Sequence, residues 1–338
     1  MDIMIKLCAQ FTANPDLYCM KINQVMAESF LEAKLVNYKN LGKVNPRFAV
    51  KDSSTEEEEK KGSEISLLTK MFFCTHHILG FEFKRIMNMH EEIIRRMSEN
   101  KEDTMYKKLL MGLDAHILHP EFMDGLLKFI TFSCTFLLVQ AYPEQIDRES
   151  SIKQFMQKLY LPLPNDTAFK FAIIPEYIIE SINRVCWFYR INFSLFFKQL
   201  QVQVIFHFYI TMLHSNSISN PHIKSQLIKF LSAVAPLPRP DSKIPTFSKD
   251  ERNRFIVLVS LFNYYLGVFE GLLHIDFAKD YILESMIKGY VECEKTGTHN
   301  QFYEKFSYRQ EILNLLQYSW RSSQKTNIIF IFFSTLRL

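Results

Sequence analysis

The feature that most restricts the fold is a proline in the first turn of three expected helices. The three segments are His119-Pro120-Glu121, Ile174-Pro175-Glu176 and Asn220-Pro221-His222. The first turn of a helix leaves its backbone N–H groups without partners, so proline, which lacks this group, fits there without loss. Glu121 and Glu176 add negative charge at the positive end of the helix dipole, and Asn220 suits the N-cap position. We therefore predict that helices begin at these three sites.

Apolar residues follow each proline at the spacing of an α-helix. They are Phe122, Leu126, Ile130, Cys134 and Leu137 after the first, Ile178, Ile182, Val185, Cys186 and Tyr189 after the second, and Ile223, Leu227, Phe230, Leu231 and Val234 after the third. This spacing gives each helix one apolar face to bury. Another helix is expected from a cap at Ser63 through Leu67 toward Ile94. Two more are expected at about 280–292 and about 300–320.

Glycine is scarce, which favours helices over strands joined by tight turns. The 338 residues include 9 glycines, where an average usage of about 7% would give roughly 24. Loops that cradle phosphate depend on glycine and must therefore be rare. No fixed-length repeat occurs, but a long series of helices without strands points to a stacked array. We predict an all-α fold built as a solenoid-like array.

Breaks in the helical pattern divide the chain into parts. A charged surface loop is expected at 52–61, and its run Glu56 to Glu59 is interpreted as solvated, with an interaction tail as the alternative. A long loop is expected near 236–254, where four prolines interrupt the pattern. The predicted parts are 1–62, a divergent N-terminal segment, 63–320, the helical core, and 321–338, an atypical tail.

Charge, cysteine content and apolar runs argue against several classes of protein. The net charge is +4 without a dense basic block, so nothing predicts binding to nucleic acid. The six cysteines form no C-x-x-C pair and we see no signal peptide, so we expect reduced thiols in a protein of the cytoplasm or nucleus. The apolar stretches 129–142 and 191–213 are short or interrupted by polar residues, so we interpret both as buried helices and predict no membrane partner.

No catalytic or cofactor-binding motif is present. G-x-G-x-x-G, the Walker loop, G-x-S-x-G and H-E-x-x-H are all missing, so we predict no catalytic residue and no cofactor. The nearest approaches to metal-ligand spacing are His116 with His119, and Cys74 with His76 and His77. Because neither has a second ligand pair nearby, we predict no metal site.

Methionines and aromatic residues admit more than one interpretation. The 31 phenylalanines and 15 tyrosines would suit base stacking or an apolar ligand, but aromatic residues at helical spacing usually form core. Met87, Met89 and Met97 stand near arginines, which is consistent with an adaptable partner surface or with an ordinary amphipathic helix. We favour the core and the amphipathic helix.

Residues 294–309 carry the most specific signal in the chain. Their sequence, EKTGTHNQFYEKFSYR, closely resembles a signature of the ubiquitin conjugation factor core. The matching positions are Thr296, Gly297, Gln301, Phe302, Lys305, Phe306 and Arg309, and Trp320 closes the following helix as in that family. Pro175 with Glu176, and Asn220 with Pro221, resemble the same family in the same order. The resemblance covers most of 63–320.

The signature also has a structural interpretation. Gly297 can end one helix in a left-handed conformation, and Asn300 can cap the next. The apolar stripe expected on that helix is Phe302, Phe306, Leu313, Leu316 and Trp320. We favour this structural role for the signature over direct contact with a partner.

The resemblance implies an elongated, armadillo-like helical array that belongs to a ubiquitin-ubiquitin ligase. In that family a U-box binds a ubiquitin-conjugating enzyme, and ubiquitin passes from the enzyme's thioester to a lysine on a substrate or on attached ubiquitin. The helical array then acts by positioning, which makes the transfer nearly unimolecular. The implied partners are a ubiquitin-conjugating enzyme, ubiquitinated substrates and a chaperone-like ATPase.

The C-terminal residues depart from the family pattern. Nothing after Trp320 resembles a U-box, and the apolar run Ile328 to Phe333 matches nothing in the family. We therefore expect a chain truncated before the U-box and inactive alone. The alternative is a free-standing helical adaptor without ligase activity. A third interpretation, an all-helical enzyme with an apolar pocket, would need converging acidic or metal-binding residues that are not visible.

Overall fold

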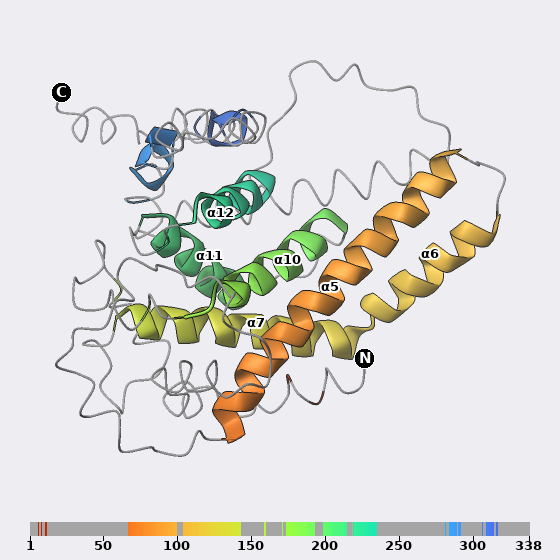
Figure 1. Ribbon diagram of the computed structural model, residues 1–338, viewed down its shortest axis with the longest axis horizontal. Coiled ribbons are helices and arrows are strands. Elements are labelled where there is room, and N and C mark those ends of the chain that lie inside the picture. The colour runs from red at the N-terminus through yellow and green to blue at the C-terminus, as the bar shows by residue number, and fades with distance from the viewer. Residues whose placement is uncertain are drawn as a thin grey trace.

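The chain is mostly helical in the part that its computed structural model describes (Figure 1). The described residues are 6, 8, 11, 67–99, 104–142, 159, 171, 174–192, 199–214, 218, 220–234, 281, 284–288, 290–291, 306, 309–313 and 316. The main helices are α5 (Leu67–Glu99), α6 (Thr104–Ile117), α7 (Pro120–Ala141), α10 (Glu176–Asn192), α11 (Gln199–His214) and α12 (Pro221–Val234). No strand occurs within these ranges, so the all-α prediction is confirmed. The solenoid arrangement stays a prediction.

The helices begin where proline predicted them. Pro120 is the first residue of α7 and Pro221 the first of α12. Helix α10 begins at Glu176, directly after Pro175, a difference of one residue from the expectation. The predicted cap at Ser63, the loops at 52–61 and 236–254, and the tail at 321–338 lie outside the described residues.

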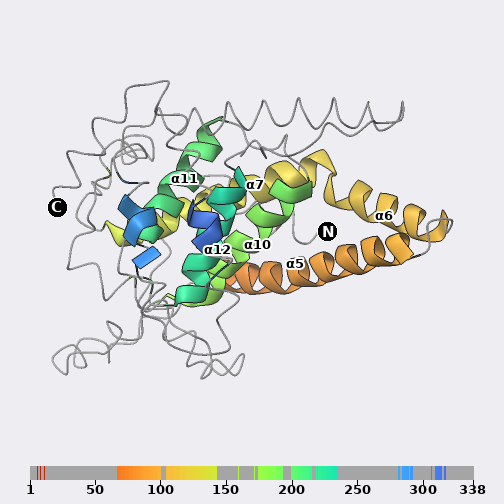
Figure 2. The ribbon, with the colours of Figure 1, turned by 90° about the horizontal axis from the view of Figure 1, so that it is seen from above.

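Helices α5 and α6 form an antiparallel pair that extends beyond the other helices (Figures 1 and 2). Helix α5 is 33 residues long, and α6 was not predicted from the sequence. His90 Nε2 of α5 lies 3.6 Å from Asp114 Oδ1 of α6. Burial raises the pKa of Asp114, and the nearby His90 partly opposes this shift. The pair therefore has a half-buried polar contact along its length.

Helix α10 occupies the centre of the bundle, where it contacts α5, α7 and α12. Helix α11 packs on α7 and α12. The core beneath α5 is aromatic: the ring centroid of Phe72 lies 4.8 Å from that of Phe136 and 6.1 Å from that of Phe129. The apolar residues predicted on α10 and α12 are buried wherever the structure describes their side chains.

Helix α7 is buried on nearly all sides. The predicted stripe of Phe122, Leu126 and Ile130 is buried, but so are Phe132 and Phe136 on other faces. The prediction of one apolar face was therefore wrong for this helix, because it packs between several neighbours. By length and composition α7 could also cross a membrane, but 72% of its most apolar window is buried within the protein. That burial is typical of a core helix.

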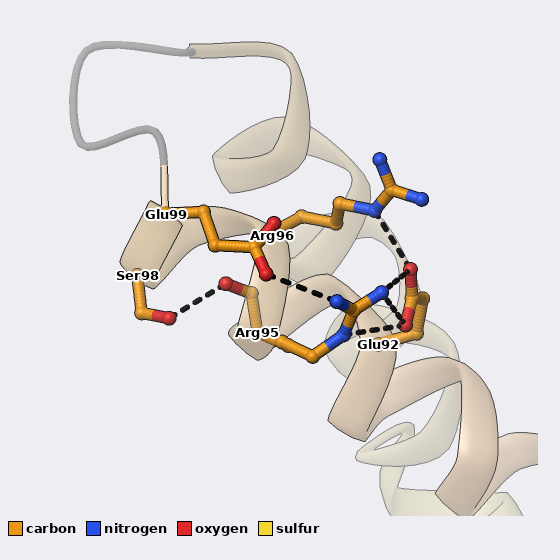
Figure 3. A network of polar contacts seen from close by, with 5 residues as sticks. All are labelled: Glu92, Arg95, Arg96, Ser98 and Glu99. Atoms are coloured by element: carbon orange, nitrogen blue, oxygen red, sulfur yellow. Dashed lines mark hydrogen bonds and ion pairs between the residues drawn. The ribbon is translucent and has the colours of Figure 1, made fainter.

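A network of exposed ion pairs lies along the last turns of α5 (Figure 3). Arg95 bonds both oxygens of Glu92, at 2.7 and 2.8 Å, and reaches Glu99 at 2.9 Å. Arg96 Nε donates to Glu92 at 2.7 Å. These hydrogen bonds, first from Arg96 and then from Arg95, lower the pKa of Glu92. Because the glutamates neutralise the arginines, this stretch is not a basic surface, which favours the amphipathic-helix interpretation of α5.

Candidate functional site

Two family-like segments far apart in the sequence meet at one joint. Asn220 Nδ2 donates a hydrogen bond of 3.2 Å to Glu176 Oε2. Asn220 Oδ1 accepts a hydrogen bond of 2.9 Å from the backbone N–H of His222, so its prediction as the N-cap of α12 is confirmed. One side chain thus caps α12 and ties it to the first turn of α10.

The ionisable group of this joint is the carboxyl group of Glu176. Glu176 is half-buried, and loss of water raises the pKa of its carboxyl group, while the hydrogen bond from Asn220 partly opposes the shift. Its position in the first turn of α10 places it at the positive end of the helix dipole. These contacts orient helices and supply no chemistry of their own.

A cleft opens beside this joint, between α5, α10 and α12. Its volume is about 330 Å³, within the range of roughly 300–1,000 Å³ that is usual for ligand sites. Met87 of α5 and Trp187 of α10 provide apolar wall. Both side chains are partly exposed. The cleft therefore offers an aromatic and a flexible apolar contact to a ligand.

Positive charge predominates around the cleft. Lys84 of α5 and Lys229 of α12 line it, and neither forms a salt bridge with any part of the chain that the structure describes. Arg184 also lines it but is held by Glu180 at 2.9 Å and by the carbonyl of Gly80 at 3.2 Å. Glu91 is the acidic residue of the lining. Two lysines are thus available to a negatively charged ligand.

A buried amide borders the same cleft. Asn183 is 4% exposed, and its Oδ1 accepts no hydrogen bond within the described part of the protein. Its Nδ2 lies 3.5 Å from Gln226 Oε1 of α12, at the long limit for a hydrogen bond. A buried acceptor without a donor costs roughly 1–3 kcal/mol. The site therefore retains a polar group that folding alone does not satisfy.

His76 fastens the helices that form the base of the site. Its Nδ1 lies 2.7 Å from Ser181 Oγ of α10, and its Nε2 lies 2.8 Å from Ser133 Oγ of α7. Burial lowers the pKa of His76 from 6.5 to about 3, so the ring is neutral and has one N–H to donate. One serine must therefore donate to the other ring nitrogen. A single side chain of α5 links three helices.

The other contacts of Ser133 and Ser181 restrict the directions of the hydrogen bonds around His76. Ser133 Oγ also lies 2.8 Å from the carbonyl of Phe129, and Ser181 Oγ lies 2.8 Å from that of Ile178. If both hydroxyls donated to these carbonyls, His76 would have to donate from both nitrogens and carry a charge. A buried charge without a counter-ion costs several kcal/mol, so one serine gives up its carbonyl contact instead.

The C-terminal signature is only partly described. Phe306 is 54% exposed and Leu313 is 48% exposed, whereas Ile312 is fully buried. The predicted stripe was therefore wrong at Phe306 and Leu313. Leu316, another residue of the predicted stripe, is partly buried against the core as expected. Ile312, one turn before Leu316 and about 100° from Leu313, takes the fully buried position. The described residues between 281 and 291 are helical, as expected.

Arg309 is the other signature residue with a described position. Its guanidinium carbon lies 5.7 Å from the ring centroid of Tyr290, a cation–π distance. The remaining signature residues lie outside the described residues: Thr296, Gly297, Gln301, Phe302, Lys305 and Trp320. The two signature residues that are described do not contribute to the cleft lining.

Two of the residues considered as metal ligands, Cys74 and His76, do not face each other at a common site. His76 is engaged by the two serines, and Cys74 is exposed. Across the described ranges no group of three or more histidine, cysteine or acidic side chains could hold a metal ion. Burial raises the pKa of the Cys186 thiol to about 12 and also raises that of Cys134 well above its ordinary value, which makes both poor nucleophiles.

Sequence reasoning missed the residues that distinguish the cleft. Lys84, Trp187 and Lys229 stand on three helices and carry no motif. The sequence does single out Trp187 in one way, because it is one of two tryptophans in the chain and stands one helical turn after Asn183. The lysines became significant only when the packing of α5 and α12 against α10 was known.

Comparison with known proteins extends the resemblance to nearly the whole chain. The family described as the ubiquitin elongating factor core matches residues 1–331. A yeast relative from Saccharomyces cerevisiae, E4 ubiquitin-protein ligase UFD2, is 26% identical over 292 residues, which are 77% of this chain and 26% of the relative.

Two further relatives come from a mammal and a plant. Ubiquitin conjugation factor E4 A of Bos taurus is 28% identical over 291 residues, covering 78% of this chain and 24% of the relative. The probable ubiquitin conjugation factor E4 of Arabidopsis thaliana is 27% identical over 169 residues, covering 49% and 14%. The chain thus matches about a quarter or less of the length of these relatives.

Proposed function

The chain belongs to the ubiquitin elongating factor core family, and from this membership we propose that it is the helical scaffold of a ubiquitin-ubiquitin ligase. Such a ligase elongates ubiquitin chains on substrates that are already modified. The observation that carries the proposal is the extent of the family match, residues 1–331. The names of the yeast and bovine relatives support the same reaction class.

The proposed mechanism is positioning. The scaffold holds a ubiquitin-conjugating enzyme and a ubiquitinated substrate so that the donor thioester and the acceptor lysine meet in one complex. Holding two reactants together supplies a large effective concentration without any covalent step on the scaffold. Two thiols of the chain, Cys134 and Cys186, are buried and have raised pKa values, so they are unsuited to accept ubiquitin, which supports this mechanism.

The proposed partners follow from the same membership. They are the ubiquitin-conjugating enzyme, ubiquitinated substrates and a chaperone-like ATPase. We place the protein in the cytoplasm, the nucleus or both. The free thiols of Cys8, Cys74, Cys134 and Cys186 are in keeping with a reducing compartment.

The test is reconstituted chain extension on a ubiquitin-fused substrate. The longest protein that the gene encodes is compared with a form from which residues 1–338 are deleted and with the 338-residue chain alone. We expect extension by the long form and its loss on deletion. Unchanged extension after the deletion, or none by the long form, would contradict the scaffold role and favour a helical adaptor outside ubiquitin transfer.

A further inference from the structure

We propose that the cleft between α5, α10 and α12 docks a short acidic peptide of another protein. An apolar side chain of the peptide sits against Trp187, and a neighbouring carboxylate pairs with Lys84 and Lys229. This inference goes beyond the proposed function, because it requires no ubiquitin transfer. It rests on three independent features of the cleft: its charge, its aromatic wall and its unsatisfied amide.

Charge selects an acidic ligand. Lys84 and Lys229 enter the cleft from opposite walls, α5 and α12, and form no ion pair within the described residues. Arg184 is already neutralised by Glu180. Glu91 offsets the charge of one lysine, so the lining keeps an excess of positive charge. Complementary charges across an interface speed association and reject partners of the wrong sign. A basic peptide would meet both lysines and is disfavoured.

The wall of the cleft suits an apolar side chain. Trp187 is partly exposed and lines the cleft together with Met87. Tryptophan is one of the residues enriched at binding hot spots, and methionine adapts its shape to different partners. The volume of about 330 Å³ accommodates a few side chains and not a folded domain.

The buried amide supplies the backbone contact. Asn183 Oδ1 has no donor among the described residues, and the 3.5 Å contact between its Nδ2 and Gln226 is weak. A peptide N–H offers the missing donor to Asn183 Oδ1, whereas Gln226 Nε2 already has a partner in His222 Nε2 at 2.8 Å.

Other occupants fit less well. Single-stranded RNA would bring phosphates next to Glu91 and would find one aromatic platform, Trp187, where such sites use several. A second copy of this chain would have to present an exposed acidic and apolar strand to the cleft. Each alternative has its own outcome in the experiment.

The experiment starts from a displayed library of random dodecapeptides panned on the 338-residue chain. We expect the enriched peptides to combine apolar residues with Asp or Glu. A synthetic version of the best peptide is then titrated by fluorescence anisotropy. The double variant Lys84→Glu, Lys229→Glu should weaken binding at least about tenfold, and Trp187→Ala about thirtyfold.

A matched control keeps the change in charge but moves it. Lys107 and Lys108 are exposed on α6 and outside the cleft, so the double variant Lys107→Glu, Lys108→Glu should leave the affinity within about twofold. Circular dichroism establishes that all variants are folded. The Asn183→Leu variant should lose peptide affinity while its unfolding midpoint stays unchanged or rises, because it removes an unpaired buried acceptor.

Several results would overturn the proposal. Enrichment of basic peptides, or of none, would remove its charge argument. Equal loss of affinity in the cleft and α6 variants would show a diffuse effect of charge. Tight binding of labelled oligouridylate, or self-association that the Lys84→Glu, Lys229→Glu variant abolishes, would assign the cleft to RNA or to a second copy. None of these outcomes bears on chain extension, so the two proposals fail separately.

Discussion

Protonation of His76 should make the stability of this protein depend strongly on pH. The ring is buried between Ser133 and Ser181, and its pKa is lowered from 6.5 to about 3. In the unfolded chain the same histidine takes up a proton near its ordinary pKa. Between these two values the unfolded state binds the proton and the folded state does not. Stability is therefore complete above about pH 6.5 and is lost as the pH falls toward about 3.

The magnitude follows from the two pKa values. At about pH 5 the unfolded chain gains about 2 kcal/mol relative to pH 8 from this one residue. His207, whose pKa burial lowers to about 4, contributes a similar amount in the same window. The wild-type protein should therefore lose roughly 4 kcal/mol of unfolding free energy from the two histidines, of a total that is typically about 5–15 kcal/mol.

Replacing the ring isolates its contribution. His76→Leu should lower the unfolding free energy at about pH 8 by about 1–3 kcal/mol, because two hydrogen bonds are lost while each serine hydroxyl can still donate to its backbone carbonyl. Its loss of stability between about pH 8 and pH 5 should be smaller than that of wild type by about 2 kcal/mol. Urea unfolding followed by circular dichroism measures both quantities.

The exposed His116 on α6 provides the control. His116→Leu should leave the pH dependence as in wild type. If His76→Leu loses as much stability on acidification as wild type does, the ring must already carry a proton in the folded protein. The two serines would then both accept from an imidazolium, and the assignment of hydrogen bonds around His76 would be wrong.

Three further substitutions test a helix cap, a close helix contact and the ion-pair network of α5. Asn220→Ala should lower the unfolding free energy by about 1–2 kcal/mol, because it removes the cap of α12 and the donor to Glu176. His119→Ala is the control, since this N-cap residue forms no side-chain hydrogen bond with its helix, and it should change the unfolding free energy little. Equal losses in the two variants would contradict the capping argument. Gly80→Ala places its Cβ 3.3 Å from Arg184 Nη1. Displacement of that flexible group should offset the gain in helix propensity and leave the unfolding free energy within about 1 kcal/mol of wild type. A larger loss in calorimetry would mean that α5 and α10 cannot separate to make room. Arg95→Gln should leave the unfolding midpoint unchanged, because its ion pairs are fully exposed, and a clear drop would show that the network does hold α5.

The helix starts were predictable because their cause is local. Proline fixes the backbone and lacks an N–H wherever it occurs, so Pro120 and Pro221 marked α7 and α12 without any tertiary information. Helix α6 was not predicted, because no proline marks its start and apolar residues such as Met105, Leu109 and Met111 remain exposed on it. A helix whose apolar residues do not all face the core gives no clear periodic signal.

Other features depend on how the helices pack. Phe306 and Leu313 are separated by seven residues and share one face of a helix, so the sequence alone suggested that this face is buried. Ile312 lies about 100° away and takes the core position instead. Apolar spacing predicts that a face is buried but not which of two neighbouring apolar faces it is. The cleft was hidden for the same reason, because its lysines approach each other only through the packing of α5, α10 and α12.

The Asn220–Glu176 joint and the hydrogen bonds of His76 together make this cleft a preformed site. Asn220 sets the distance between α10 and α12 through Glu176, and His76 sets the position of α5 against α10 through Ser181. All three walls are therefore fixed by buried or half-buried polar contacts before any ligand arrives. A rigid site loses little conformational entropy on binding, so even a short peptide with one apolar anchor and one carboxylate can gain useful affinity. If the cleft instead closes up when Asn220 is replaced, peptide binding and helix capping should fail together, and the degree of their coupling measures how far the scaffold creates the site.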